Sequence, residues 1–462
     1  MKYLIILSIL FIQACSDGGG QDAGVALIQD QTFSGSLAGE PVSIQKIASL
    51  NKEYIDSSLT STSSTLAGVA LYGAHIYKLT YVSNDANQGS DTFNASGLLI
   101  VPYSVEDDEN NSAPWIVLSH GTIVDNASAP TNNLGEGLLE ASRGFITLVP
   151  DYIGFGESYN SDPTTRIHPY IIASSYASDG VNMMNAAKSV LSSIGITLGN
   201  LYLKGYSEGG YATLALQKEL ETNHSSTYTI AASAPSAGPY STVGLGQQLT
   251  TTMADSTVSP TLFGYLATSY YYNYPSISAQ YSLNAVFNQS ESYDVENLFN
   301  GQKSSTETEA LYASLGISTI NGLLSSDVVS AMGAQLTALV VASANPVDLL
   351  TEIATMTESF SGALFGNDLV FSGWAPSSDT YFYHCADDAT IPATITTSAV
   401  SVFEILSSSI TTIATATGGH GGCPYIFTPT LCFSQLEGAG SKANYDNAVA
   451  ASLPGFEVGY CQ

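Results

Sequence analysis

Short apolar segments alternate with segments of helical spacing through much of this 462-residue chain. From about Ala74 onward the apolar segments have the length of buried strands, and the segments between them repeat apolar residues every three or four positions. Such an alternation favours a mainly parallel sheet with helices on both faces, which is an α/β fold. We expect strands at His75–Ser83, Phe93–Val101, Trp115–Leu118, Phe145–Pro150, Leu201–Lys204, Tyr228–Ala234, Thr380–His384 and Ile410–Thr417, and helices at Leu134–Ser142, Ile171–Ile194, Gly209–Glu221 and near Thr394–Leu406.

The alternation stops between Ser241 and Ala375. This segment is rich in Ser, Thr, Ala, Leu and Tyr and has the pattern of short helices. With roughly 130 residues it is too long to be a plain loop. We therefore predict one α/β domain, formed by residues 42–240 and 376–462, that is interrupted by a mostly helical cap at residues 241–375.

The N-terminus has the features of an export signal. Lys2 precedes the apolar run Tyr3–Ile12, which is too short to span a bilayer. The segment Ile12–Cys15 resembles the bacterial lipobox, in which the signal peptide is cut before a cysteine that becomes diacylated. We predict a signal peptide at residues 1–14 and lipid attachment at Cys15. An ordinary signal peptide with a chance cysteine is the alternative.

The polar, Gly-rich residues 15–41 are expected to form a flexible tether. Ser16, and not an aspartate, follows the cysteine, which resembles outer-membrane sorting in Gram-negative bacteria. We therefore expect an exported lipoprotein of the cell envelope, located at the outer membrane or the cell surface.

The charge balance excludes several classes of partner. Lys and Arg number 11 against 40 Asp and Glu, and the formal net charge is −29. A chain this acidic, with no basic run, is not expected to bind nucleic acid or an anionic membrane surface. The sequence also has no His/Cys cluster with metal spacing and no Walker or Rossmann glycine pattern. We predict no metal and no cofactor, and contact with a membrane only through the lipid anchor.

The pentapeptide Gly205–Gly209 has the pattern G-x-S-x-G. The pattern alone is weak evidence in a chain with 41 glycines and many serines. It follows the expected strand Leu201–Lys204 and opens the next helix, which is where a nucleophile elbow must lie. Ser207 is therefore the candidate nucleophile, with a simple Gly/Ser turn at a helix N-terminus as the alternative.

A serine hydroxyl needs a general base, and the elbow topology requires the chain order Ser, Asp or Glu, His. The segment His384–Pro392 resembles the pattern H-G-x-x-D-x-x-V-P of α/β hydrolases, which identifies Asp388 as the acid and leaves Asp387 as the alternative. His420 lies after the last strand in a Gly-rich loop, which we expect to be mobile, and is the candidate base. We expect His384 to be structural and His224 to be a solvated loop residue.

The negative oxygen of the reaction intermediate needs backbone N–H donors. One donor should be the amide of Glu208, the residue after the nucleophile. The second should follow an early strand, and Leu118–Thr122 resembles the H-G motif of that loop. We predict the Thr122 amide, with Gly121 as the alternative, and we expect His120 to brace the loop.

Two further segments complete a resemblance to a family. Asp151–Ser158 and His168–Tyr170 together resemble the D-Y-x-G-x-G-x-S…H-P-Y pattern of the secretory lipase (lipase A-like) family, an exported branch of the α/β hydrolases. The resemblance extends from about Tyr72 to the C-terminus, while the cap matches only in position and approximate length. It implies a serine esterase or lipase that cleaves carboxylic esters, including acylglycerols. We expect His168 to be a structural hydrogen-bonding residue.

The sequence thus predicts an ester hydrolase with the triad Ser207, His420 and Asp388, acting on a small-molecule or lipid ester. A peptidase or amidase with the same triad is one alternative, and an inactive, surface-tethered binding protein is another. We expect the cap to form a lid over the carboxyl edge of the sheet and to set substrate choice. A structural extension packed away from the site is the other possibility for the cap.

Four cysteines remain if Cys15 is acylated, an even number in an oxidising compartment. They are Cys385, Cys423, Cys432 and Cys461. We favour Cys385–Cys423 with Cys432–Cys461, since the first pair would join the acid segment to the base segment. A Cys423–Cys432 pair is nearly as well supported.

Overall fold

The computed structural model of the protein describes residues 33–37, 40–85, 92–107, 111–160, 167–251, 260–288, 298–342, 346–356, 359–407, 409–413, 416–426 and 429–440. In this part of the chain ten strands form one sheet, in the order β1-β2-β3-β4-β6-β5-β7-β8-β9-β10. The strands are β1 (Phe33–Leu37), β2 (Glu40–Leu50), β3 (Ala74–Asn84), β4 (Thr92–Pro102), β5 (Ser112–Ser119), β6 (Ile146–Pro150), β7 (Thr197–Tyr206), β8 (Ile230–Ser236), β9 (Thr380–Tyr383) and β10 (Ile410–Ile413).

The sheet has a parallel part and an antiparallel part. Strands β6, β5, β7, β8, β9 and β10 run parallel to one another, while β1 to β4 form an antiparallel extension attached to β6. The predicted α/β class with a mainly parallel central sheet is confirmed. The eight strands expected from apolar runs are all present, and the opening pair β3 and β4 is antiparallel.

The first two strands, at one edge of the sheet, were not predicted, and β1 lies inside the expected tether. Strand β1, Phe33–Leu37, pairs with β2, so the ordered fold begins earlier than residue 42. In β2 the buried Val42 and Ile44 alternate with more exposed polar residues, the pattern of a strand with one buried face. The expected signal peptide, Cys15 and the first part of the tether lie outside the described residues.

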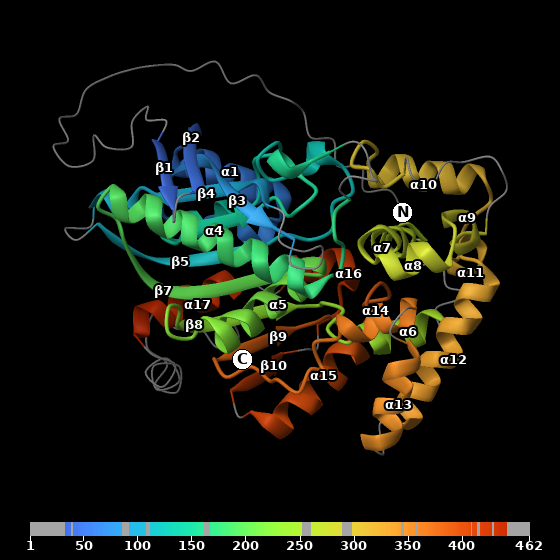
Figure 1. The fold of residues 1–462 in the computed structure, drawn as a ribbon. Coiled ribbons are helices and arrows are strands. Elements are labelled where there is room, and N and C mark those ends of the chain that lie inside the picture. The colour runs from blue at the N-terminus through green and yellow to red at the C-terminus, as the bar shows by residue number, and fades with distance from the viewer. Residues whose placement is uncertain are drawn as a thin grey trace.

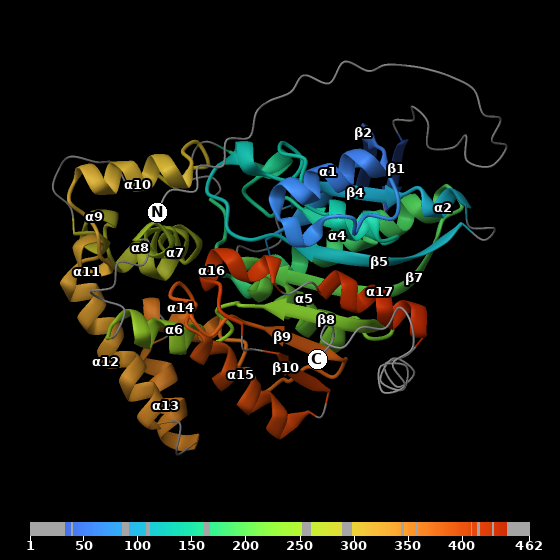
Figure 2. The same ribbon diagram turned by 180° about the vertical axis from the view of Figure 1, so that it is seen from behind.

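Helices cover both faces of the sheet. Helices α4 (Ala173–Ser193) and α5 (Glu208–Asn223) lie in front of the sheet in Figure 1, and α1 (Lys52–Thr62) and α17 (Pro429–Ala439) lie in front in the reverse view of Figure 2. The remaining helices of the core are α2 (Ser104–Asp107), α3 (Leu138–Ser142), α15 (Ala393–Leu406) and α16 (Gly419–Gly422), with single 3₁₀ turns at Ser64–Leu66, Asn126–Ser128, Gly156–Ser158 and Cys423–Tyr425.

Helix α3 is shorter than the helix expected at Leu134–Ser142. It begins only after Gly137, whose φ of 81° lies in the left-handed region. A Cβ at Gly137 would also lie 2.8 Å from Ile100 of β4. Because the chain turns sharply against the sheet at this glycine, the first turn of the expected helix cannot form.

The central strands bury side chains on both faces. Alternate residues of each strand point to opposite faces, so they pack into a separate part of the core on each side of the sheet. Val117 and Leu203 pack with Met183 of α4 on one face, whereas Ile116 and Tyr202 pack with Phe433 of α17 on the other. Every residue of β6 is buried. This explains why the central strands appear in the sequence as continuous apolar runs.

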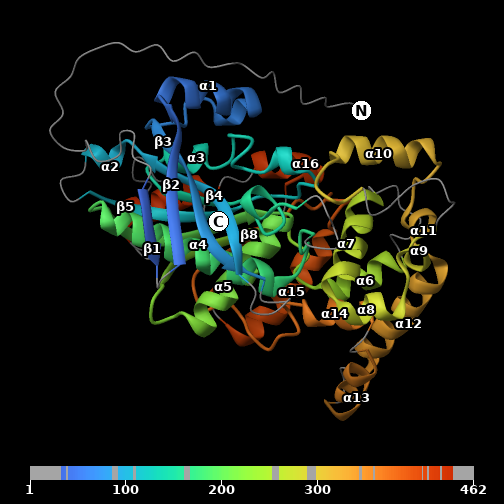
Figure 3. The ribbon, with the colours of Figure 1, turned by 45° about the horizontal axis from the view of Figure 1, so that its top comes forward.

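A group of helices stands at one end of the sheet, to the right in Figure 1, and Figure 3 shows the same group from above. Its members are α6 (Thr242–Leu249), α7 (Pro260–Asn273), α8 (Pro275–Gln280), α9 (Leu283–Val286), α10 (Ser305–Ser314), α11 (Ile320–Leu323), α12 (Ser326–Ala342), α13 (Pro346–Met356) and α14 (Phe360–Gly366). We call this group the cap. Its interior is apolar, with side chains such as Leu336 and Leu339 fully buried. Among the described helices, none combines the length and the hydropathy needed to cross a membrane.

Candidate active site

Ser207 lies in the sharp turn between β7 and α5, with φ 61° and ψ −122°. A non-glycine residue rarely adopts this conformation, which costs free energy and is found mainly at functional sites. The flanking glycines make the turn possible. A Cβ at Gly205 would lie 2.1 Å from the carbonyl oxygen of Gly209, and a Cβ at Gly209 would lie 2.0 Å from that of Ser119. The pentapeptide therefore has the geometry that a nucleophile elbow requires.

The side chains of Ser207, His420 and Asp388 form a hydrogen-bonded chain. Nε2 of His420 lies 2.8 Å from Oγ of Ser207, and Nδ1 of His420 lies 2.6 Å from Oδ2 of Asp388. A carboxylate can only accept, so Nδ1 carries the proton and Nε2 accepts the serine hydroxyl. In this tautomer the imidazole is ready to take a proton from Ser207.

Asp388 is held as a charged group although its side chain is buried. Its Oδ1 accepts the amides of Thr390 and Ile391, both at 2.9 Å. Burial works against the charge, but hydrogen bonds from His384 and His420 outweigh it and hold the pKa of the Asp388 carboxyl well below its usual range. His384 lies on the far side of the acid, with Nε2 3.2 Å from Oδ2 of Asp388.

Asp387, the alternative acid, has a different position. Its exposed carboxylate accepts the backbone amides of Gly418 and Gly419, with nearest distances of 2.9 Å. These hydrogen bonds lower the pKa of the Asp387 carboxyl. Asp388 thus contacts the imidazole of His420, whereas Asp387 contacts the backbone just before it.

The segment that carries His420 is a short helix and not the loop that its glycines predict. Residues Gly419–Gly422 form the short helix α16, and the hydroxyl of Tyr206 donates to the carbonyl oxygen of His420 at 2.8 Å. A disulfide joins Cys385 to Cys423, which excludes the alternative Cys423–Cys432 pair. The second favoured pair involves Cys461, which lies outside the described residues, and stays a prediction.

The two candidate amide donors follow neighbouring strands. Strand β5 pairs with β7, with Ser119 opposite Gly205, so the loop to Thr122 and the turn at Ser207 leave the same edge of the sheet. The chain passes from β5 to β6 on one side and later to β7 on the other, which makes this edge a topological switch point, where open α/β sheets bind ligands. The Glu208 amide opens α5 and has no acceptor within that helix.

His120 lies in the first of these loops. It is buried, stacks on the ring of Tyr152 at 4.0 Å between centroids, and has Nδ1 2.7 Å from the carbonyl oxygen of Gly121. The hydroxyl of Tyr152 donates to the carbonyl oxygen of His120 at 2.9 Å. These contacts hold the loop before Thr122.

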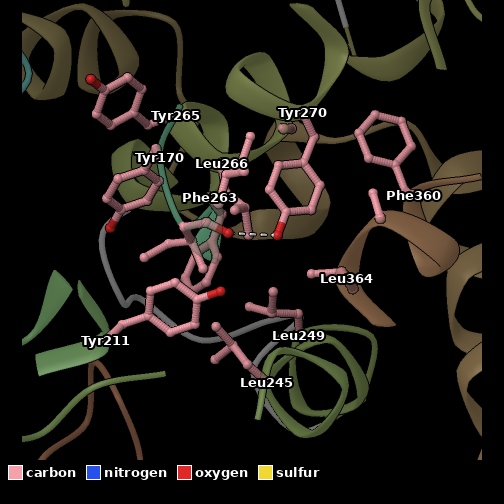
Figure 4. Packing of buried hydrophobic residues seen from close by; sticks show 14 of the residues in the cluster. Tyr170, Tyr211, Leu245, Leu249, Phe263, Tyr265, Leu266, Tyr270, Phe360 and Leu364 are labelled. Carbon is pink, nitrogen blue, oxygen red and sulfur yellow. Dashed lines mark hydrogen bonds between the residues drawn. The ribbon is translucent and has the colours of Figure 1, made fainter. Parts of the chain in front are cut away.

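Two small apolar cavities lie near the candidate nucleophile and in the cap. The first is lined by Ser207 and Glu208 together with Phe263 and Leu266 of the cap. The second lies inside the cap and is lined entirely by apolar and aromatic residues. Phe263 and Leu266 line both cavities, and Figure 4 shows them facing the side chains of α6 and α14. The cap therefore lies over the candidate nucleophile.

Sequence reasoning missed the side chain of Glu208, which was expected to contribute only its amide. Its Oε1 lies 2.9 Å from Nε2 of His168 and accepts the hydroxyl of Tyr176 at 2.9 Å. His168 and Glu208 are both almost completely buried. A charged residue next to a nucleophile, and a histidine in a family motif, were the signals that could have pointed to this pair.

The fold is similar to solved structures of esterases and lipases. The rice cell wall degrading esterase LipA from Xanthomonas oryzae matches with a TM-score of 0.63 and 22% sequence identity, over 86% of this chain and 96% of that chain. Candida antarctica lipase A in its closed state matches with a TM-score of 0.56 and 12% identity, over 86% and 81%. A candidate hydrolase from Legionella pneumophila gives 0.66 and 18%, over 85% and 95%.

No protein-family model and no curated protein sequence matches the chain. The structural similarities, all below 25% identity, establish that the chain has the α/β-hydrolase fold.

Proposed function

We propose that the protein is a serine hydrolase of carboxylic esters, with Ser207 as nucleophile, His420 as base and Asp388 as the acid that orients it. The observation that carries this proposal is the unbroken hydrogen-bonded chain from Ser207 through His420 to Asp388, with distances of 2.8 and 2.6 Å. It begins at a strained elbow and lies beneath an apolar cavity. A binding protein that had lost activity would have no need to keep this strain and this chain of contacts.

In the first half of the reaction Ser207 attacks the ester carbonyl while His420 accepts its proton at Nε2. Asp388 keeps Nδ1 protonated and stabilises the imidazolium. The negative oxygen of the tetrahedral intermediate accepts the amides of Glu208 and Thr122, and each such donor contributes roughly 3–4 kcal/mol to the transition state. His420 then gives its proton to the departing alcohol, which leaves an acyl group on Ser207.

In the second half a water molecule loses a proton to His420 and attacks the acyl-enzyme. The same amides stabilise the second intermediate, and its collapse returns the proton to Ser207. The buried position of Asp388 keeps the orienting charge out of water, where it acts more strongly on the imidazolium.

The cap determines which acyl groups reach the nucleophile. The linings of both cavities carry no positively charged side chain. Phe263 and Leu266 line both cavities, so an uncharged aliphatic acyl chain bound at Ser207 would contact these two apolar side chains of the cap. We therefore propose fatty acyl esters as substrates and the segment 241–375 as a lid. The N-terminal signal, with acylation of Cys15, would place this activity outside the cytoplasm.

The test combines labelling with a substrate screen. A fluorophosphonate probe should modify the purified protein once, and mass spectrometry should locate the modification on Ser207. The unlabelled protein should hydrolyse p-nitrophenyl esters, and labelling should abolish the hydrolysis. Faster cleavage of peptide anilides than of esters would instead identify an amidase, and absence of both labelling and turnover would refute the proposal.

A further inference from the structure

Glu208 follows Ser207 in the chain, and the reaction steps above do not use its buried carboxyl group. Only 1% of the residue is exposed. Its Oε1 contacts His168 and Tyr176, while its Oε2 is buried and has no hydrogen-bond partner among the described residues. An ionised carboxylate in such a place is costly unless a nearby group compensates its charge.

His168 has the position of that compensating group. Its Nδ1 lies 2.7 Å from the carbonyl oxygen of Ile153, which can only accept, so Nδ1 carries a hydrogen. Its Nε2 lies 2.9 Å from Oε1 of Glu208. The hydroxyl of Tyr176 accepts the amide of Ile171 and donates to the same Oε1. A hydrogen between Nε2 and Oε1 therefore leaves the His168–Glu208 pair with no net charge, whichever atom holds it.

The aromatic rings around His168 supply no competing charge. The rings of Tyr152, Phe155, Tyr170, Tyr176 and Tyr265 surround the imidazole, with centroid distances from 5.0 to 6.2 Å. Burial, and then the charge of Glu208, raise the pKa of the four tyrosines, so their hydroxyls stay neutral. Asp179 of α4 is the other acid near His168, and it is hydrogen-bonded to Ser83 and Tyr81.

The same surroundings reach the second amide donor. Tyr170, two residues after His168, has its hydroxyl 3.1 Å from Oγ1 of Thr122 and its ring stacked on Tyr265 of the cap at 4.7 Å. Thus one short segment, His168–Tyr170, contacts the residues of both candidate amide donors. The pair therefore lies beside the residues whose amides are proposed to bind the negatively charged oxygen of the substrate.

We propose that His168 and Glu208 form a proton-sharing positioning pair. It fixes the first turn of α5, and it keeps the carboxyl group beside Ser207 from opposing the negative charge on the bound ester oxygen. This inference rests on the proposed ester hydrolysis at Ser207. It assigns a role to two side chains that do not themselves react.

The experiment separates charge compensation from simple packing by a double-variant cycle. His168→Asn keeps a donor at the position of Nδ1 and removes Nε2, so Glu208 loses its proton-sharing partner. Glu208→Gln keeps the acceptor for Tyr176 and removes the charge. The turnover number and KM for a p-nitrophenyl ester are measured from pH 5 to 9 for each single variant and for the double variant, with active sites counted by fluorophosphonate titration.

We expect kcat of His168→Asn to fall by about 100-fold at the alkaline end with KM changed by less than about threefold. The loss should grow with pH, because the unpartnered carboxyl group ionises beside the developing negative charge. Glu208→Gln should lose less than about tenfold and show no such growth. The double variant should recover at least about tenfold over His168→Asn at pH 9, because no carboxylate is left to compensate.

Glu140→Gln is the matched control. Glu140 is also buried, paired with Lys204 and hydrogen-bonded by Thr430, but it contacts neither the turn nor the cap. It should change stability without altering the pH dependence of kcat. A double variant as slow as His168→Asn, or a His168→Asn profile parallel to that of the wild type, would overturn the proposal.

If His168→Asn yields no folded protein, the double variant decides: folded protein with the kcat of Glu208→Gln supports the pair, and failure of both to fold contradicts it. Labelling of wild-type Ser207 with ester turnover is measured first. A failure of the proposed function is therefore visible independently of this test.

Discussion

The edge of the sheet that carries Ser207 and the cap above it hold their side chains in different ways. At the sheet edge, hydrogen bonds fix the polar atoms of Ser207, His420 and Asp388, and those of Asp387 and His384 next to them. The larger cavity of the cap is bounded by aliphatic and aromatic side chains that are held mainly by packing, with one hydrogen bond from the hydroxyl of Tyr270 to the carbonyl oxygen of Ile171. Hydrogen-bonded positions tolerate little change, whereas packed positions accept other side chains of similar volume at a cost of about 1.5 kcal/mol or less.

This difference predicts that the two regions control different quantities. Substitutions at the sheet edge should lower turnover for every ester, because the reacting groups are the same for all of them. Substitutions in the cap should change the relative rates on different esters. The variants below test this division in order of decreasing expected effect.

The largest effect is expected for Ser207→Ala. Ester hydrolysis should fall by about five to six orders of magnitude, because the other triad members cannot act without the nucleophile. Initial rates on p-nitrophenyl butyrate, together with circular dichroism to verify folding, measure this. Ser401→Ala on the exposed side of α15 is the control and should retain wild-type turnover. A Ser207→Ala protein that retains more than one per cent of the activity would exclude Ser207 as nucleophile.

The adjacent aspartates provide a matched pair for the second prediction. Asp388→Asn should lower kcat by about 10⁴-fold, because the amide no longer holds the imidazole in the required tautomer. Asp387→Asn should lower it by less than about tenfold, since Asp387 contacts only the backbone before His420. Steady-state kinetics on one short ester compare the two. Equal losses would contradict the assignment of the acid.

These two residues also show where sequence reasoning ends. The spacing of the pattern around His384–Pro392 identified Asp388 as the acid and left Asp387 as the alternative, because two identical neighbouring side chains differ in the sequence by only one position. The central strands were predictable because burial on both faces requires continuous apolar runs. The Gly-rich segment around His420 was not, since its helix is fixed by Asp387, Tyr206 and a disulfide from distant parts of the chain.

The His168–Glu208 contact illustrates the same limit. The two residues lie 40 positions apart, and each has an ordinary local explanation in the sequence. Only the path of the chain around the sheet brings them together.

The third prediction concerns the disulfide at the sheet edge. Replacing Cys385 and Cys423 by serine should lower the free energy of unfolding by about 2–4 kcal/mol, because the bridge restricts the unfolded chain across 38 residues. Urea denaturation followed by tryptophan fluorescence measures the change. When the wild-type protein is denatured in the presence of a reductant, its free energy of unfolding should fall by at least this amount. An unchanged unfolding midpoint in the variant would contradict the prediction.

The fourth prediction uses pH to perturb the core without touching the triad. Burial raises the pKa of Asp179 to about 6, although Ser83 and Tyr81 donate hydrogen bonds to it. A carboxyl group with a raised pKa binds more protons in the folded state, so its contribution to stability is greatest below pH 4 and is lost as pH rises to about 6. The loss amounts to roughly 3 kcal/mol, from the size of this pKa difference.

Asp179→Asn removes this titration. The stability of the wild type relative to the variant should therefore decrease between pH 4 and pH 6 and stay constant above. Urea denaturation of both proteins at several pH values measures the difference. A difference that does not change with pH would show that Asp179 has no raised pKa.

The smallest effect is expected in the cap. Leu266 lines both cavities, so the larger side chain in Leu266→Phe should reduce the space for an acyl chain in both. The rate on a dodecanoyl ester relative to a butanoyl ester should fall by about tenfold, while the butanoyl rate changes by less than about threefold. Val341→Phe on an exposed position of α12 is the control and should leave the ratio unchanged. Equal losses on both esters would contradict the division between the two regions.

The place of the cap in the chain has a consequence for biosynthesis. Ser207 precedes the cap and His420 follows it, 213 residues later, so the nucleophile is synthesised long before its base. A nascent chain that already contains the elbow and the whole cap still lacks His420, so no imidazole can accept a hydrogen bond from Ser207. The proposed hydrolytic activity therefore requires the chain as far as α16, which follows the last strand of the sheet. Under the proposed mechanism, a chain that ends before this helix cannot activate Ser207.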